Sequence, residues 1–267
     1  MKKAIIKWLK ILGIAYVLIG LAIYFLQDMI LFHPVSLKAG YKYTFKQTHR
    51  DINLQPDSAS NLNVIEFTTA DSVRGVVLYF HRNKKNIAWY AAYAGNFTKH
   101  GYEVWMIDYP GYGKSTGRFT EADLYKYAGA LYQLAKKRFS SDKIIIYGKS
   151  MGTGIAAELA STNDCRQLIL ETPYYSFVTL GKHYLPIYPV NPMLHFKMPT
   201  YEYLPKVKSP ITIFHGTDDW IIPYSNASLL KPLLKQTDAF VTIKGGSHNN
   251  LNDYDLFHQK LDSLLSH

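Results

Sequence analysis

Apolar and amphipathic stretches alternate along most of this chain, after a long apolar first segment. Short apolar runs bounded by polar or turn residues predict central strands, and stretches with apolar positions about every three or four residues predict helices. We predict strands at 73–81, 103–108, 142–147, 167–171, 211–215 and 240–243, and helices at 86–100, 121–139, 151–160, 227–234 and 253–265. This alternation is typical of a mostly parallel sheet covered by helices on both faces, so the predicted fold class is α/β.

Two regions differ in composition from these elements. Residues 35–72 are rich in polar and turn residues and predict edge strands that lead into the sheet. Residues 174–209 hold many aromatic side chains and five prolines between two predicted strands. Connections of this length are more often functional than plain loops, so we predict a small cap over the carboxyl end of the sheet. An ordinary irregular excursion is the alternative.

The first segment combines basic residues with a long uncharged run. Four lysines lie within residues 2–10, and residues 11–26 carry no charge. This pattern predicts a membrane anchor over residues 1–30, followed by one domain over residues 31–267. A cleaved signal peptide and a buried helix of the domain are the alternatives. The lysines favour a cytoplasmic N-terminus with the domain across the membrane, although three further lysines within residues 38–46 weaken that orientation.

Composition narrows the classes of function. The chain has 267 residues, 48% of them hydrophobic, which suffices for one sizeable domain without disulfides or metals. Cys165 is the only cysteine, so we predict neither a disulfide nor a cysteine-based metal site. The net charge of +10 comes from short scattered basic groups. We therefore expect a solvated basic surface with some attraction to anionic lipid headgroups, and no nucleic-acid partner.

One serine stands at a predicted strand-to-helix turn. The segment Gly148-Lys149-Ser150-Met151-Gly152 follows an apolar run and precedes a stretch of small, helix-compatible residues. The two glycines let strand and helix approach closely at a strained turn, which holds the serine oxygen clear of the backbone. A nucleophile is presented in this way, so Ser150 is the candidate nucleophile.

A nucleophilic serine needs a base for its proton and a carboxylate that orients the base. Asp218 and Asp219 follow one predicted strand, and His248 follows the last one. Both places lie beyond the carboxyl ends of strands, where the loops of such a sheet converge, and the chain order Ser, Asp, His fits the serine turn. We predict His248 as the base and one of the two aspartates as the acid. The competing bases are His81, His100, His183 and His215. For the two at strand ends, His81 and His215, structural hydrogen bonding is the ordinary role.

Acyl transfer also needs backbone donors for the oxyanion of the tetrahedral intermediate. One should be the N–H of Met151, directly after the serine. The second should come from residues 81–83, in the loop after a predicted strand. The glycine-punctuated loop 108–117 lacks the spacing of a phosphate-binding loop, so we predict a structural loop beside the site.

Taken together, these segments resemble the α/β-hydrolase superfamily, in particular its membrane-anchored serine hydrolases with a small cap. That group includes serine-aminopeptidase-like and acyl-thioesterase-like members. The matching segments are 78–81, 108–117, 148–152, 171–173, 214–219, 221–223 and 245–248, and they cover most of residues 30–265. The resemblance implies an α/β-hydrolase fold with Ser150 as nucleophile, Asp219 rather than Asp218 as acid, and His248 as base. It also implies that the basic, apolar N-terminus is an anchor.

The chain departs from this family at the second oxyanion donor. The family usually has His-Gly after its oxyanion strand, whereas Arg82 follows His81 here. A backbone that needs a positive φ at this place would be strained by Arg82. We assign the second donor to the N–H of Asn83, with Arg82 as the other candidate.

The predicted function is hydrolysis of a carboxylic ester or thioester through an acyl-enzyme, with a small acyl or lipid-like substrate. The many tyrosines of residues 174–209 and the closeness of a bilayer favour such substrates over charged peptides. The alternatives are an aminopeptidase-like amide hydrolase and a catalytically silent binding protein with the same fold. We expect no cofactor and no metal.

Overall fold

Eight strands form the central sheet of the computed structural model, which describes all residues except 70, 71 and 267. The strand order is β10-β9-β8-β7-β4-β6-β3-β2, and only the β6–β3 and β3–β2 pairs are antiparallel. The strands are β2 (His49–Asp57), β3 (Ser60–Phe67), β4 (Gly75–Phe80), β6 (Tyr102–Ile107), β7 (Ile144–Lys149), β8 (Gln167–Glu171), β9 (Ile211–Gly216) and β10 (Ala239–Ile243). The predicted α/β fold is confirmed, and β2 and β3 are strands at the edge predicted within residues 35–72.

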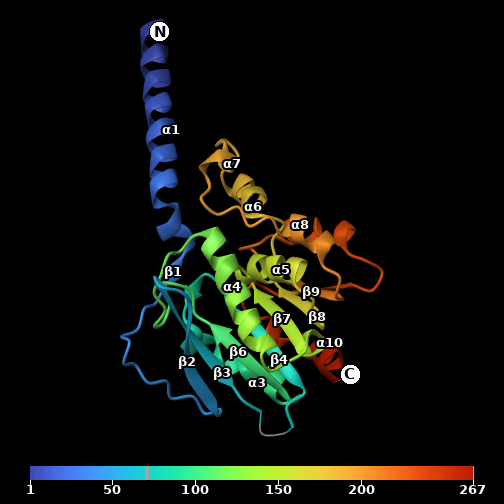
Figure 1. Cartoon of the computed structure of the whole chain (residues 1–267). Helices are drawn as coiled ribbons and strands as arrows, with labels where there is room; N and C mark the ends of the chain where they lie inside the picture. Colours follow the sequence, from blue (N-terminus) through green and yellow to red (C-terminus); the bar gives the residue numbers. More distant parts are fainter. Residues whose placement is uncertain (70–71, 267) are drawn as a thin grey trace.

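Helices cover both faces of the sheet (Figure 1). The main ones are α4 (Glu121–Lys136), α5 (Gly152–Thr162) and α10 (Asp255–Ser266). Side chains alternate along the buried strands: Val76 and Leu78 of β4 pack with α4 and α5, whereas Val77 and Tyr79 pack with α10 and the segment after β4. Each face of the sheet thus has its own hydrophobic core, which fixes the strand ends that carry the site.

Two predicted helices are broken into short pieces. The stretch 86–100 contains α2 (Ile87–Tyr90), a 3₁₀ turn (Ala91–Ala94) and α3 (Gly95–Thr98). Its aromatic residues, glycine, asparagine and threonine are weak helix formers. The stretch 227–234 contains the end of α9 (Tyr224–Ser228) and a 3₁₀ turn (Lys231–Leu233). Pro232 lies in that turn and cannot continue an α-helix, because it lacks an N–H and its ring clashes with the preceding turn.

The first helix, α1 (Lys2–Leu31), projects away from the sheet and its helices (Figure 1). It is long and apolar enough to cross a membrane, and its most apolar window is not buried against the rest of the chain. Directly after it, β1 (His33–Pro34) pairs in parallel with β5 (Lys84–Lys85). The chain leaving α1 is therefore hydrogen-bonded to the loop that follows β4.

The segment between β8 and β9 contains α6 (Phe177–Tyr184), α7 (Val190–Met193), α8 (Thr200–Tyr203) and a 3₁₀ turn (Leu204–Lys206). We call residues 174–209 the cap segment. Figure 1 shows α6 and α7 rising beside α1, while α8 lies over α5. The segment is therefore not a single layer over the sheet, because its first half extends along the first helix.

Candidate active site

The turn between β7 and α5 holds Ser150 in a left-handed conformation, with φ of 53°. This conformation costs a non-glycine residue on the order of 1–2 kcal/mol, so neighbouring contacts must maintain it. The N–H of Ser150 donates to the carbonyl of Glu171 at 2.9 Å, and the N–H and hydroxyl of Thr153 donate to the carbonyl of Ser150 at 2.9 and 2.6 Å. These bonds fix the backbone on both sides of the serine.

The glycines flanking Ser150 are required by close approach. A Cβ on Gly152 would stand 2.1 Å from the carbonyl oxygen of Phe80, and a Cβ on Gly148 would stand 2.5 Å from the carbonyl oxygen of Gly152. Both distances are far below van der Waals contact with backbone atoms that have no room to move. The serine turn therefore packs closely against the end of β4.

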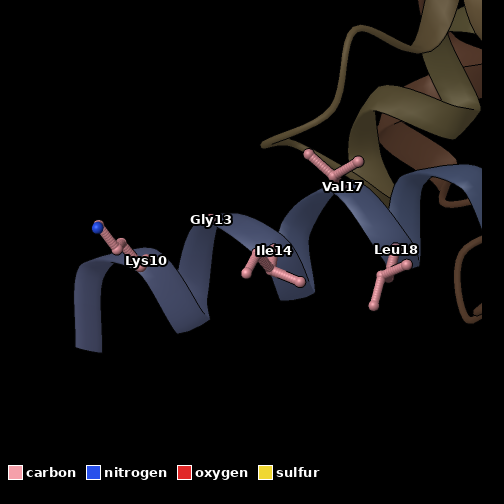
Figure 2. A pocket seen from close by; sticks show the side chains of 5 residues that line it. All are labelled: Lys10, Gly13, Ile14, Val17 and Leu18. Atoms are coloured by element: carbon pink, nitrogen blue, oxygen red, sulfur yellow. The ribbon is translucent and has the colours of Figure 1, made fainter. Parts of the chain in front are cut away.

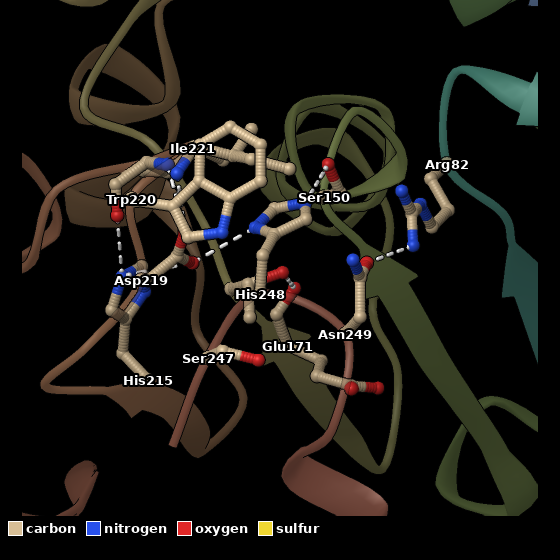
Figure 3. Close-up of polar contacts among 12 residues, drawn as sticks. Arg82, Ser150, Glu171, His215, Asp219, Trp220, Ile221, Ser247, His248 and Asn249 are labelled. Carbon is tan, nitrogen blue, oxygen red and sulfur yellow. Dashed lines mark hydrogen bonds and ion pairs between the residues drawn. The ribbon is translucent and has the colours of Figure 1, made fainter. Parts of the chain in front are cut away.

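The predicted triad residues lie in one hydrogen-bonded chain (Figure 3). Nε2 of His248 is 2.9 Å from Oγ of Ser150, and Nδ1 of His248 is 2.8 Å from Oδ2 of Asp219. The carboxylate can only accept, so Nδ1 carries the proton and Nε2 accepts from the serine hydroxyl. Ser150 and His248 are 6% and 1% exposed, so this contact is shielded from bulk water.

Backbone donors orient Asp219, and a second histidine lies beside it. Its Oδ1 accepts from the N–H groups of Ile221 and Ile222 at 3.0 and 2.8 Å. Nε2 of His215 lies 2.9 Å from the carbonyl of Ile222 and 3.4 Å from Oδ2 of Asp219. Burial lowers the pKa of His215, with the nearby carboxylate of Asp219 opposing the shift. A neutral His215 donates from Nε2 to the carbonyl of Ile222 and lies beside Asp219.

Asp218 is excluded from this chain of hydrogen bonds, because its carboxylate accepts from the hydroxyl of Thr217 at 2.7 Å. The other candidate histidines also lie elsewhere. His100 pairs with Asp262 at 2.8 Å, and the exposed His183 packs edge-on against Tyr184. Of the histidines predicted as possible bases, His248 alone is hydrogen-bonded to Ser150 in the described part of the chain.

His81 is the buried support of the loop after β4. Its Nδ1 lies 2.7 Å from the carbonyl of Arg82, and its Nε2 lies 3.2 Å from Asp108. Burial raises the pKa of Asp108, while the His81 contact opposes the shift. Asp108 also accepts from the N–H of Ile87 at 2.9 Å. These contacts give His81 the structural role that was predicted for it.

The condition under which Arg82 would be strained, a positive φ at that residue, is not met. In the described residues the positive φ of this loop falls on Lys85, at 68°, and not on Arg82 or Asn83. The arginine side chain donates to Asn249, the residue after His248 (Figure 3). A side chain is therefore accommodated where the family usually has glycine, because the backbone at Arg82 does not have a positive φ.

The end of α1 and the segment that follows it are hydrogen-bonded to the loop after β4. The carbonyl of Asn83 accepts from the N–H of His33 at 2.9 Å and from the hydroxyl of Tyr112 at 2.8 Å, and the side-chain amide of Asn83 donates to the carbonyl of Leu31. No hydrogen bond within the described residues uses the N–H of Met151, Arg82 or Asn83. These three N–H groups are the predicted oxyanion donors.

The loop 108–117 is structural, as predicted. Ser115 donates from its hydroxyl to the carbonyl of Asp108 at 2.7 Å and accepts from the N–H of Asn63 at 2.8 Å. Gly113 has a positive φ, and a Cβ there would stand 2.0 Å from the carboxylate of Asp108.

Among the residues that the structure describes, no group of three or more His, Cys, Asp or Glu side chains is placed to hold a metal ion.

Known proteins with a similar sequence or fold indicate which superfamily the chain belongs to. The model of the family described as serine aminopeptidase, S33, matches residues 71–198. In the solved structures, the esterase Pf2001 of Pyrococcus furiosus superposes with a TM-score of 0.70 at 16% identity, covering 87% of this chain and 98% of the esterase. The monoacylglycerol lipase of Paleococcus ferrophilus gives 0.59 at 19% identity, over 77% of this chain and 98% of the lipase. The chain belongs to the α/β-hydrolase superfamily.

Curated α/β-hydrolase relatives extend the likeness. Alpha/beta hydrolase domain-containing protein 17C of Mus musculus is 27% identical over 228 residues, which cover 84% of this chain and 67% of that protein. Alpha/beta hydrolase domain-containing protein aho-3 of Caenorhabditis elegans is 31% identical over 166 residues, covering 61% of this chain and 48% of that protein. The chain thus matches about two thirds or less of the length of these relatives.

A buried ionic cluster beside the serine of this α/β-hydrolase was not predicted. Lys149 is fully buried, donates to the carboxylate of Glu171 and lies 4.6 Å from the ring centre of Tyr93. The hydroxyl of Tyr147 donates to the other oxygen of that carboxylate. Burial, with the charge of Glu171, raises the pKa of Tyr147 well above its usual range. A lysine directly before the serine and a glutamate ending the next strand were the available signals.

Proposed function

We propose that the chain is a serine hydrolase that cleaves carboxylic esters or thioesters with an acyl or lipid-like part, through an acyl-enzyme. The observation that carries the proposal is the continuous hydrogen-bonded chain from Ser150 through His248 to Asp219. The names of the esterase and lipase among the structural neighbours agree with it. Attachment to a membrane through α1 is part of the proposal, on the length and apolar character of that helix.

Each residue has a role in the proposed reaction. Ser150 attacks the acyl carbon while His248 takes its proton at Nε2, and Asp219 stabilises the resulting imidazolium. The protonated His248 then gives the proton to the leaving alcohol or thiol. Water, activated by the same histidine, attacks the acyl-enzyme and releases the acid, which restores Ser150.

The oxyanion of the tetrahedral intermediate would be held by backbone N–H groups. Met151 supplies one donor, at the N-terminus of α5, where the helix dipole also favours negative charge. Asn83 supplies the second, with Arg82 as the other candidate. The close approach of the serine turn to the end of β4 supports a donor from this loop.

Hydrolysis by the full chain in detergent tests the proposal. Short and long acyl esters, acyl thioesters and aminoacyl amides are compared as substrates for the original chain and for Ser150→Ala. We expect turnover of the esters or thioesters, and its loss in the variant. Faster turnover of the amides would favour the aminopeptidase-like alternative, which the family model's description supports. Equal ester turnover by Ser150→Ala would refute the assignment of the nucleophile.

A further inference from the structure

The tip of the cap segment, residues 184–190, contacts α1 far from the sheet (Figure 1). The rings of Tyr16 and Tyr188 stack with their centres 4.6 Å apart and their planes 2° from parallel. The hydroxyl of Tyr16 donates to the carbonyl of Ile187 at 3.0 Å, and the hydroxyl of Tyr188 donates to the carbonyl of Tyr16 at 3.1 Å. Gly20 leaves room for this contact, because a Cβ there would stand 3.0 Å from the ring of Tyr188.

A second contact joins the cap segment to the base of α1. Gln27, the one buried residue of that helix, donates to the carbonyl of Met193 at 2.9 Å and accepts from the N–H of His195 at 2.8 Å. His195 also lies 3.2 Å from the carboxylate of Asp28. Because the cap segment is held at two levels of α1, its tip has a defined position along that helix.

The position of Tyr16 sets the depth of the tip in a bilayer. Tyr16 stands ten residues before Leu26, the last residue of the uncharged run, which corresponds to about 15 Å of helix. The hydrocarbon core of a bilayer is about 30 Å thick. If α1 spans the bilayer with its uncharged run in this core, a segment stacked on Tyr16 cannot remain in water.

The composition of the tip suits such an environment. Residues 184–194 carry no charge, and Ile187 is 70% exposed. A groove of about 290 Å³ between the tip and α1 is lined by Tyr16, Val17, Gly20, Leu21, Tyr24, Tyr188, Pro189 and Met193. Figure 2 shows Ile14 and Leu18 projecting from the neighbouring part of α1, where they are 61% and 60% exposed, while Val17 borders the groove. Apolar surface therefore continues from the helix onto the tip.

The backbone of the tip is also largely paired, as a lipid environment requires. Pro186 and Pro189 have no N–H to satisfy. The N–H of Tyr188 donates to the carbonyl of Leu185 at 3.1 Å, and that of Val190 donates to the carbonyl of Tyr188 at 2.9 Å. The hydroxyl of Tyr16 donates to the carbonyl of Ile187, whose side chain is 70% exposed.

We propose that the tip of the cap segment, residues 184–190, is embedded in the lipid bilayer alongside α1. The inference rests on the membrane attachment proposed above for α1 and adds a second element to it. Tyr184 links the tip to the candidate site, since its hydroxyl is 2.8 and 2.9 Å from the carbonyls of Trp220 and Ile221, directly after Asp219. An acyl chain leaving the bilayer along the cap would thus arrive beside the triad.

Spin labels report whether a site faces lipid or water. Single labels are placed by Ile187→Cys, Leu18→Cys and Lys208→Cys in the full chain, in phosphatidylcholine vesicles. Cys165→Ser removes the native thiol and keeps a partner for the hydroxyl of Ser209, 3.3 Å away. Collisions with oxygen, which concentrates in lipid, are compared with collisions with a water-soluble nickel chelate. Leu18 is the control for lipid, and Lys208, exposed on the segment that precedes β9, is the control for water.

The proposal expects oxygen to exceed the chelate at positions 187 and 18, and the reverse at position 208. A label at 187 that behaves like position 208, while position 18 faces lipid, overturns the proposal and leaves the anchor intact. Chelate access at both 187 and 18 overturns the anchor as well. Low access to both reagents at 187 overturns the proposal in favour of cover by a second copy of the chain.

Discussion

The two sides of the candidate site are built differently. Ser150, His248 and Asp219 stand on loops that follow parallel strands. A backbone bond to the end of the neighbouring strand β8 holds Ser150, and two N–H groups of its own loop hold Asp219. The loop of the proposed second oxyanion donor is instead held by Leu31, the last residue of α1, and by His33 in the segment that follows. The sheet thus determines the geometry of the triad, whereas the end of the first helix contributes to that of the oxyanion loop.

This difference indicates where the site is sensitive to its surroundings. Changes within the sheet should affect nucleophile activation and folding together. Changes at the junction with α1 should affect stabilisation of the transition state while leaving the triad in place. The following variants separate the two sides, from the largest expected effect to the smallest.

Asp219→Asn should lower kcat by about four orders of magnitude, because the amide favours the wrong tautomer of His248. Esterase kinetics measure the loss. Asp218→Asn is the matched control and should retain nearly full activity, since that carboxylate bonds only to Thr217 among the described residues. Equal losses in the two variants would contradict the assignment of the acid.

Lys149→Met should destabilise the fold by about 3–5 kcal/mol, because it leaves the buried carboxylate of Glu171 without its cation. Urea unfolding followed by circular dichroism measures the change. The double variant Lys149→Met with Glu171→Leu removes both charges and should regain most of the lost stability. A double variant as unstable as the single one would show that packing, and not the unpaired charge, sets the cost.

Stability should fall as the pH drops below about 6.5, the ordinary pKa of histidine. Burial lowers the pKa of His215 in the folded state, so the unfolded chain binds the proton first and gains stability relative to the fold. The slope from this group is at most about 1.4 kcal/mol per pH unit. Unfolding of His215→Gln across pH 5 to 8 should show a shallower slope than the original chain, and an identical slope would exclude His215 as the cause.

Asn83→Ala should lower kcat about five- to tenfold with little change in KM, since it removes one hydrogen bond, worth about 1 kcal/mol, from the oxyanion loop. Ester kinetics at several substrate concentrations separate the two constants. Asn96→Ala is the control, because it removes a comparable bond to Asn252 outside the site. A raised KM with normal kcat would indicate a binding role for Asn83 instead.

The sequence predicted that Ser150, Asp219 and His248 come together at the strand ends, whereas the position of the loop after β4 could not be predicted from it, for a physical reason. The serine turn depends on Gly148 and Gly152 next to it, and Asp219 and His248 follow strands whose apolar runs are recognisable locally. The position of the loop after β4 depends instead on residues about fifty positions earlier, through the bond from Asn83 to Leu31. Such pairings leave no periodic signal.

The fold shows the same division. The central strands were predicted within a few residues, because each is a buried apolar run. The stretch 86–100 was predicted as one helix but is broken into short pieces. Its path is determined more by His81, Asp108 and the strand ends than by helix propensity. The path of α6 and α7 along α1 depends on the stack of Tyr16 with Tyr188, two residues far apart in the sequence.

Covalent trapping of the nucleophile tests the central claim most directly. The full chain is treated with a fluorophosphonate, and digestion with mass spectrometry then locates the adduct. The account predicts one adduct, on Ser150, formed much more slowly when His248 is replaced by glutamine. An adduct confined to another residue, or labelling at Ser150 that does not depend on His248, would contradict it.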